Sequence, residues 1–228
     1  MITVVILNWA RPENVKQILT HLADAANVDE IIVWNNNIQC APSSFMTHSP
    51  KITLIDSTRD MSLFTRFAAA SLARNEATLY HDDDVLVPHD VLVGLEEAWK
   101  KDPSRIYGLM GRIRRKNGSY SRPLRHGDCP IILTTTMIAH RRYASMALQF
   151  RDHPEIGPIL ATGKPYGNGE DMVISYVAMR ESGKLNHACA MSGKRLPQPH
   201  AICRRWPHHF KYRDRLLKAL DKHVIRLG

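Results

Sequence analysis

Short apolar segments alternate with amphipathic segments through the first hundred residues of the chain. The apolar segments have the length and β-branched composition of strands, and the amphipathic ones have the length of helices. We expect strands at residues 3–7, 30–34, 52–55 and 77–80, and helices at 12–25, 62–75 and 88–100. The alternation predicts an α/β fold with a mostly parallel, Rossmann-like central sheet flanked by helices. Ligands of such sheets bind beyond the carboxyl ends of the strands.

The second half of the chain predicts a hairpin followed by mixed helices and strands. Asn117-Gly118 is typical of a hairpin turn, here between strands at 106–116 and 119–122. We then expect a strand at 129–138, a helix at 139–150, a loop at 151–168, a helix at 170–182, a strand at 184–190 and a helix at 210–225. No change in composition marks a boundary, so the 228 residues predict a single domain.

Three adjacent carboxylates, Asp82-Asp83-Asp84, directly follow the fourth predicted strand. Like charges this close repel one another, and a divalent cation with oxygen ligands removes the repulsion. In an extended backbone, Asp82 and Asp84 project to the same side. We predict that Asp84 and Asp82 bind Mn²⁺ or Mg²⁺, which can bridge to a diphosphate. The alternative is an acidic turn that caps the helix at 88–100.

Two polar segments precede this motif at places where the predicted sheet would bring them near it. Arg66 lies on the helix before the aspartates, from where it could reach a diphosphate or orient Asp82. Asn35 and Asn36 follow the second strand, where their amides could read a nucleobase. A surface arginine and an asparagine turn are the structural alternatives.

Glu170 and Asp171 begin a predicted helix directly after Gly167-Asn168-Gly169. Acidic residues at this end of a helix are stabilised by its dipole, which is one explanation of the pair. A glycine-rich loop that presents two carboxylates is also suited to catalysis. We predict Asp171 and Glu170 as catalytic residues.

The segment before the terminal helix joins cations, an aromatic ring and imidazoles. We predict that Arg205 contacts a departing phosphate, that Trp206 contacts an acceptor, and that His209 or His208 completes the metal shell. The alternative is a charged, exposed tail.

Positive charge is concentrated at the end of the chain. The net charge is +9, and residues 194–228 hold ten Lys/Arg against two Asp, a net of +8. Such a stripe attracts polyanions. Arg213, Arg215 and Lys218 fall at near-helical spacings, so we predict that they contact a polyanionic acceptor. The apolar start at 2–7 is too short to span a bilayer and nothing longer follows, so we expect a cytoplasmic protein with no membrane partner.

These residues, in this order, resemble the exostosin family of glycosyltransferases (family 64), over nearly the whole chain. The likeness rests on these segments: the strand ending in Trp34-Asn35-Asn36, Arg66, Asp82-Asp83-Asp84, the strand at 106–112, Gly169-Glu170-Asp171 and Trp206 to His209 with its basic helix. The family's Asn-Arg pair after the first strand is Ala10-Arg11 here, so Arg11 alone carries over.

The resemblance implies a GT-A fold and a hexosyl- or N-acetylhexosaminyltransferase that uses a UDP-sugar and manganese and retains anomeric configuration. It implies a catalytic role for Asp171. From the order of the predicted elements we separately expect a donor-binding half at 1–104 and an acceptor-binding half at 105–228. The predicted donor-binding residues are Arg11, Asn35, Asn36, Arg66, Asp82, Asp83 and Arg205. A Glu-Asp pair before a helix also occurs in inverting transferases, so the stereochemistry stays open.

Several functions are compatible with these patterns. The acceptor of a transferase could be a nucleic acid, such as a hydroxymethylated pyrimidine in viral-type DNA, or a saccharide or glycan precursor. A non-catalytic nucleic-acid-binding protein would explain the basic tail but not the aspartates, which repel phosphate. A nucleotidyltransferase would require a glycine-rich loop after the first strand, and residues 8–12 contain no glycine.

Overall fold

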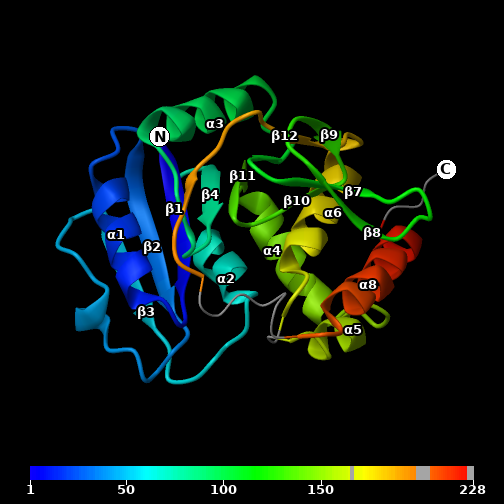
Figure 1. Ribbon diagram of the computed structural model, residues 1–228, viewed down its shortest axis with the longest axis horizontal. Helices are drawn as coiled ribbons and strands as arrows, with labels where there is room; N and C mark the ends of the chain where they lie inside the picture. The colour runs from blue at the N-terminus through cyan, green and yellow to red at the C-terminus, as the bar shows by residue number, and fades with distance from the viewer. Residues whose placement is uncertain (165–166, 199–205, 225–228) are drawn as a thin grey trace.

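The computed structural model describes residues 1–164, 167–198 and 206–224, and within them an eight-stranded sheet forms the centre of the molecule (Figure 1). In spatial order its strands are β3 (Ile52–Asp56), β2 (Val28–Asn35), β1 (Ile2–Asn8), β4 (Ala77–His81), β11 (Thr136–His140), β6 (Tyr107–Gly108), β12 (Asn186–Ala188) and β9 (Gly127–Cys129). Only β11 and β9 run against the other strands of this sheet. The predicted mostly parallel sheet is confirmed.

Helices cover both faces of the sheet (Figure 1). Every residue of β1 is buried, as is typical of a parallel strand with helices on both sides. Val4 and Ile6 face a core shared with α1 (Pro12–Ala23) and α3 (His89–Lys101). Val5, which points the other way, joins the core of α2 (Thr65–Ser71), α4 (Arg142–Leu148) and α6 (Glu170–Ser182).

The remaining elements are short, apart from the terminal helix. The described residues also contain η1 (Pro42–Ser44), β5 (Val85–Leu86), β7 (Gly111–Arg114), β8 (Tyr120–Leu124), β10 (Ile131–Ile132), η2 (Gln149–Arg151), α5 (Gly157–Ala161), β13 (Lys194–Arg195) and α8 (His209–His223). The hairpin predicted at Asn117-Gly118 is confirmed, with Gly118 at φ 77° between β7 and β8. The predicted helix at 170–182 agrees with α6, and the one at 210–225 with α8 up to the end of the described residues.

The helix predicted at 62–75 is wrong at both ends. Ser62 has φ 91°, so it lies in a turn ahead of α2 and its Oγ accepts a hydrogen bond from the backbone of Phe64. After α2, the backbone N–H of Arg74 donates to Glu30, and the side chain of Asn75 donates to Thr3. These contacts anchor the chain to the sheet and end the helix early.

The single strand predicted at 129–138 is also wrong. The chain divides there into β9, β10 and β11, and β10 pairs with β7 in a separate three-stranded sheet. Pro130 has no N–H to donate, so it interrupts the strand at its start. Likewise, the expected strand at 106–116 is split into β6 and β7, the helix at 139–150 begins only at Arg142, and the expected loop at 151–168 contains α5.

A segment near the end of the chain returns to the middle of the sheet. It runs from β12 across the front of the molecule, coloured orange in Figure 1, and pairs β13 with β5. The backbone N–H of Leu196 donates to the carbonyl of Asp84, and the Asn14 side chain donates to the carbonyls of Asp83 and Pro197. The aspartate turn is therefore held from two sides. In the described part of the chain, no helix is both long and apolar enough to cross a bilayer.

Candidate active site

Asparagine side chains link the carboxyl ends of the first three strands. Asn8, Asn35 and Asp56 end β1, β2 and β3 in register. The amide of Asn8 donates to Asn35 Oδ1 at 2.9 Å, and the amide of Asn35 donates to Asp56 Oδ1 at 2.8 Å. Asn35 is completely buried. Its side chain therefore fixes the edge of the sheet and does not project from it.

Asn36 plays a similar part in the adjoining loop. Its Nδ2 donates to the carbonyl of Ser62 and to Thr65 Oγ1, both at 3.1 Å, and its Oδ1 accepts from the backbone of Met61. The sequence suggested that Asn35 and Asn36 read a nucleobase through their amides. In this structure both amides are engaged within the protein, because buried polar groups at strand ends must find partners.

The three aspartates have three different surroundings. Asp82 accepts a hydrogen bond from Arg66 Nη1 at 3.0 Å. Asp83 pairs with Arg11, whose Nη1 also lies 3.8 Å from Asp84 Oδ2. The other oxygen of Asp84, Oδ1, is buried and has no hydrogen-bond partner among the described residues. Two predicted donor-binding arginines thus partly neutralise the motif.

The aspartate turn has the properties expected of a cation site. Burial raises the pKa of Asp83 to about 6 although Arg11 opposes it, and burial followed by the charge of Asp82 raises the pKa of Asp84. A divalent cation would relieve this cost, and the unpaired Oδ1 of Asp84 is a suitable ligand. Among the described residues, no three His, Cys, Asp or Glu side chains form a closed metal shell. Protein carboxylates would therefore supply part of the shell, as is usual for Mg²⁺ beside a phosphate.

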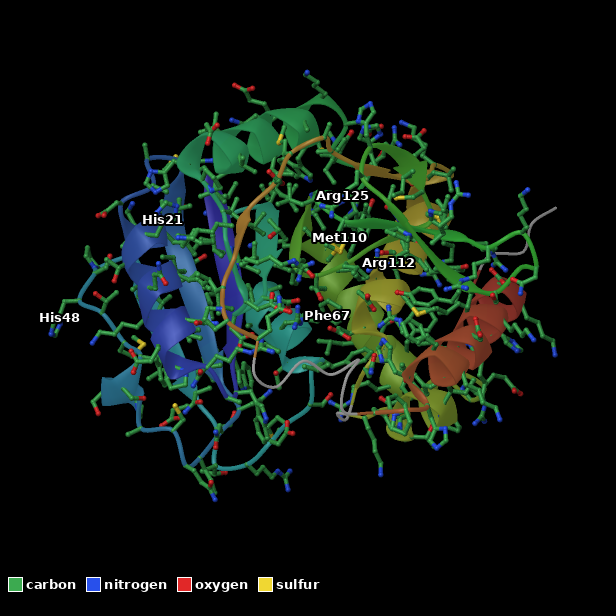
Figure 2. All side chains as sticks on the ribbon, in the orientation of Figure 1. His21, His48, Phe67, Met110, Arg112 and Arg125 are labelled. Atoms are coloured by element: carbon green, nitrogen blue, oxygen red, sulfur yellow. The ribbon has the colours of Figure 1, made fainter. Side chains whose placement is uncertain are left out.

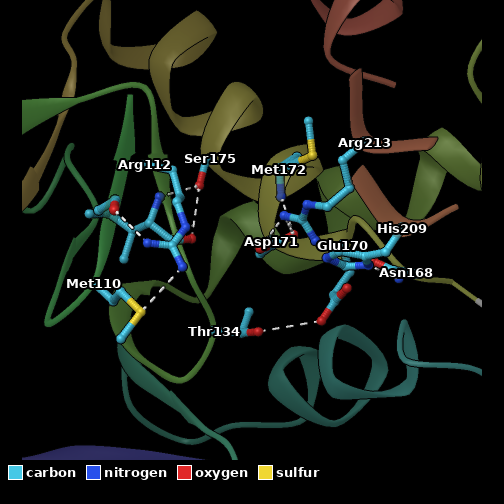
Figure 3. A network of polar contacts seen from close by, with 12 residues as sticks. Met110, Arg112, Thr134, Asn168, Glu170, Asp171, Met172, Ser175, His209 and Arg213 are labelled. Carbon is cyan, nitrogen blue, oxygen red and sulfur yellow. Dashed lines mark hydrogen bonds and ion pairs between the residues drawn. The ribbon is translucent and has the colours of Figure 1, made fainter. Parts of the chain in front are cut away.

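Arg66 connects the aspartates to the predicted catalytic pair. Its side chain is 7% exposed, and while Nη1 contacts Asp82, Nη2 lies 3.7 Å from Glu170 Oε1. The same Glu170 oxygen accepts from Thr134 Oγ1 at 3.3 Å (Figure 3). Burial raises the pKa of Glu170 to about 7, against the opposing charge of Arg66. Glu170 can therefore exchange a proton near neutral pH.

Asp171 forms a buried ion pair with Arg213 of α8. Arg213 Nη2 lies 2.7 and 2.5 Å from the two carboxylate oxygens, and its Nη1 donates to Asn168 Oδ1 (Figure 3). The guanidinium also stacks over Tyr120, 4.6 Å from the ring centre. Arg213 was predicted in an exposed acceptor-binding stripe, and that prediction is wrong. It faces inward because helical periodicity places it on the face of α8 that packs against the core.

The aromatic segment before α8 packs beside this pair. Trp206 is partly buried, with its ring 5.0 Å from that of Tyr212. His209 Nδ1 accepts a hydrogen bond from Asn168 Nδ2 at 3.2 Å, and burial together with Arg213 lowers the pKa of His209 to about 4. His208 is exposed.

The predicted metal role of these histidines is not supported by the structure. His209 is held by Asn168, and neither His209 nor His208 joins Asp82 and Asp84 in a group that could enclose a metal. The predicted phosphate contact Arg205 lies outside the described residues.

Sequence reasoning missed several residues around the centre of the site. Asn168 joins Arg213 to His209, and Thr134 contacts Glu170. The Gly-Asn-Gly sequence drew attention to this loop, but nothing in the sequence indicated Thr134. A cavity beside the aspartate turn is lined largely by residues that carried no motif, among them Val85, Arg125, Thr135 and Ser192.

Comparison with protein families gives a match over almost the whole chain. The model of the "Glycosyl transferase family 64 domain" matches residues 2–223.

Curated relatives share modest identity with this chain. Exostosin-2 of Homo sapiens and of Mus musculus is 26% identical over 114 residues, which is 49% of this chain and 16% of the relative. Glucosamine inositolphosphorylceramide transferase 1 of Arabidopsis thaliana is 26% identical over 178 residues, 76% of this chain and 23% of the relative. The chain thus spans less than a quarter of the length of these relatives.

A solved structure with a similar fold is that of GalNAc-T7 with UDP, GalNAc and Mn²⁺. Its TM-score is 0.57 at 11% sequence identity, and the match covers 82% of this chain and 42% of the other. This likeness confirms the GT-A fold.

Proposed function

The chain belongs to glycosyl transferase family 64, and from this premise we propose that it transfers a sugar from a UDP-sugar to a hydroxyl group of an acceptor. The observation that carries the proposal is the position of Arg66, which contacts Asp82 on one side and Glu170 on the other. This position supports a single site that contains both the proposed cation-binding aspartates and the carboxylate pair. We assign donor binding to residues 1–104 and acceptor binding to 105–228.

The donor diphosphate would lie at the aspartate turn. Asp82 and Asp84 would hold Mn²⁺ or Mg²⁺, which when bound neutralises charge on the diphosphate. In this structure Arg11 and Arg66 form ion pairs with carboxylates. Their guanidinium groups are also suited to bind phosphate oxygens. The crystal of GalNAc-T7 with UDP and Mn²⁺ supports this choice of donor and metal.

The surroundings of the two acids favour retention of configuration. An inverting mechanism requires a base that takes the acceptor proton. Both oxygens of Asp171 accept hydrogen bonds from Arg213, which fixes the position of its negative charge. Such a charge suits the stabilisation of positive charge on the sugar ring. Glu170, with its raised pKa, can hold or release a proton at Oε1.

Replacing Asp171 by Asn tests this role. We expect kcat to fall by about 10²–10⁴, with the UDP dissociation constant near that of wild type, because Asp171 does not touch the aspartate turn. Glu181→Gln, a neutralisation at the other end of α6, is the control and should leave kcat unchanged. A normal kcat combined with a lower melting temperature would show that Asp171 only stabilises the helix.

A nucleic acid is our candidate acceptor, specifically a hydroxymethylated pyrimidine in DNA. Without Arg213, the exposed cations of α8 still form a stripe at spacings of four, three and four: Lys211, Arg215, Lys218 and Lys222. Such a stripe repels itself unless an anion neutralises it. The alternative is a saccharide or glycan precursor. The Arabidopsis relative, named glucosamine inositolphosphorylceramide transferase 1, favours an acceptor other than a nucleic acid.

A UDP-release assay tests the proposal directly. Several UDP-sugars are crossed with hydroxymethylated DNA and with saccharides in the presence of Mn²⁺, and the anomeric configuration of any product is read by NMR. We expect release that depends on one sugar and one acceptor, and a retained configuration. A protein that neither binds UDP with Mn²⁺ nor releases it would overturn the proposed activity.

A further inference from the structure

Three arginines lie around the cavity beside the aspartate turn. Arg125 and Arg195 line it, and Arg112 Nη2 lies 3.6 Å from the sulfur of Met110, another lining residue. Arg112, Met110 and Arg125 lie together near the middle of the molecule (Figure 2). In the described part of the chain, the ion pairs beside the aspartate turn are made by Arg11 and Arg66 and not by these three arginines, although the charge of Arg195 acts on Asp84. We call this space the arginine cavity.

The arginine cavity lies next to both halves of the proposed reaction centre. Thr135 lines it, and its carbonyl accepts from the backbone N–H of Asp82 at 3.1 Å. The neighbouring Thr134 donates to Glu170. Val85, which follows Asp84, forms another part of the wall. A group bound there would be close to the aspartates and to Glu170.

We propose that the arginine cavity binds a phosphate group of the acceptor and so selects phosphorylated acceptors. The inference rests on the proposed function. Guanidinium groups bind phosphate through paired N–H donors, and three positive charges suit a phosphate dianion better than a single carboxylate. Arg11 and Arg66 are assigned to the donor side, which leaves Arg112 and Arg125, together with Arg195 near Asp84, for a second anion.

Two kinds of acceptor carry such a phosphate, namely a polynucleotide and a phosphorylated sugar or polyol. The shared chemistry is tested first with inorganic phosphate, titrated by calorimetry into the protein with UDP and Mg²⁺. Turnover is then compared for glucose 6-phosphate, glucose, glucuronate and a hydroxymethylated oligonucleotide. We expect phosphate binding, and at least a tenfold higher kcat/KM for a phosphorylated acceptor than for glucose or glucuronate.

Exposed arginines permit variants that should fold. Arg125→Met with Arg195→Met should weaken phosphate binding tenfold or more and raise KM for the phosphorylated acceptor by the same factor. The UDP dissociation constant should not change. Arg112→Met should act in the same direction. Arg122→Met, an exposed arginine of the neighbouring β8, is the matched control and should leave all values unchanged.

The possible outcomes separate the two proposals. Two results would overturn the proposed phosphate site and leave the proposed transferase activity intact. One is that phosphate does not bind to the UDP complex. The other is that the phosphate dissociation constant and KM are unchanged by the substitutions at Arg125 and Arg195. Loss of UDP binding in the wild type would instead overturn the proposed function. A higher kcat/KM for the oligonucleotide or for the sugar phosphate identifies which acceptor carries the phosphate. Either preference supports the phosphate site, provided that the arginine variants abolish that preference.

Discussion

At the scale of single residues, buried carboxylates and arginines neutralise one another across the candidate site. Arg66 and Arg213 are both almost fully buried and each contacts an acid of the Glu170-Asp171 pair. Isolated buried charges are costly, so each arginine reduces the desolvation penalty of its partner. Among the carboxylates of the described site, Asp84 differs from the others, since its buried Oδ1 lacks a hydrogen-bond partner.

The unpaired oxygen of Asp84 leads to a prediction about metal dependence. Asp84→Ala should abolish the Mn²⁺-dependent part of UDP binding, measured by calorimetry, while the far-UV spectrum stays that of a folded protein. Asp24→Ala removes an exposed carboxylate at the end of α1 and should have no effect. If wild-type UDP affinity were undiminished in EDTA, the metal assignment would be refuted.

The raised pKa of Glu170 predicts a pH-dependent stability. Burial raises it from 4.5 to about 7. The charged groups facing Glu170 are Arg66 and Arg213, which oppose the rise, and Asp171 and Asp82, which support it. In the unfolded chain Glu170 ionises near 4.5, so its stabilising contribution is complete below that pH and is lost as pH rises through about 7.

The measurement compares wild type with Glu170→Gln by urea unfolding at several pH values. Between pH 4.5 and 7, wild type should lose about 3 kcal/mol relative to the variant. Above and below this window the difference should be constant. Parallel curves for the two proteins across the whole range would refute a raised pKa for Glu170.

At the scale of elements, the pairing of α8 with α6 decides how the second half of the chain is held together. The apolar face of α8 buries Leu216, Leu217 and Leu220, and the Arg213–Asp171 ion pair lies on the same side. α8 therefore contributes both packing and the orientation of a predicted catalytic carboxylate.

Replacing one partner of this ion pair should lower the free energy of unfolding more than replacing both partners. Arg213→Met should lower the unfolding free energy by about 3–5 kcal/mol, because Asp171 remains buried without its partner. Adding Asp171→Leu should restore part of the loss, as measured by a double-mutant cycle in urea. Lys184→Met breaks an exposed pair with Asp102 and should cost less than about 1 kcal/mol. If the two substitutions changed the unfolding free energy additively, Arg213 and Asp171 would not be coupled.

At the scale of the whole molecule, positive charge is unevenly distributed. The outer face of α8 carries Lys211, Arg215, Lys218 and Lys222, while its inner face belongs to the core. A phosphate backbone that neutralises such a surface releases its counterions, so binding must weaken as salt rises.

Salt dependence therefore tests the nucleic-acid acceptor. DNA affinity, measured by fluorescence anisotropy, should fall steeply with salt, and Arg215→Glu with Lys218→Glu should weaken binding about tenfold or more and flatten the slope by about two. UDP affinity should not change. Lys16→Glu with Lys101→Glu gives the same net charge, +5 instead of +9, on α1 and α3, and should have little effect. Equal effects of both double variants would show that only total charge matters.

The sequence by itself determined the α/β architecture and the place of the aspartates. Buried strands and amphipathic helices follow from local periodicity, and β1, α1, β4 and α6 lie where that periodicity put them. It also determined that Asp82-Asp83-Asp84 lies at the carboxyl end of a central strand. Local patterns fail where distant contacts intervene, as at Asn75, whose bonds to Thr3 and Asp29 end α2.

Only the tertiary structure decided which charges are paired. Arg213 and Arg215 are two positions apart, yet one lies buried on Asp171 and the other is exposed, because the packing of α8 on α6 selects the inner face. Arg66 meets both Asp82 and Glu170 only because α2 lies between segments far apart in the chain. Arg125 and Arg195 line one cavity, and Arg112 contacts Met110 in its wall, for the same reason. The spacing of residues in the sequence does not reveal these long-range contacts, because they depend on how the two halves of the chain pack.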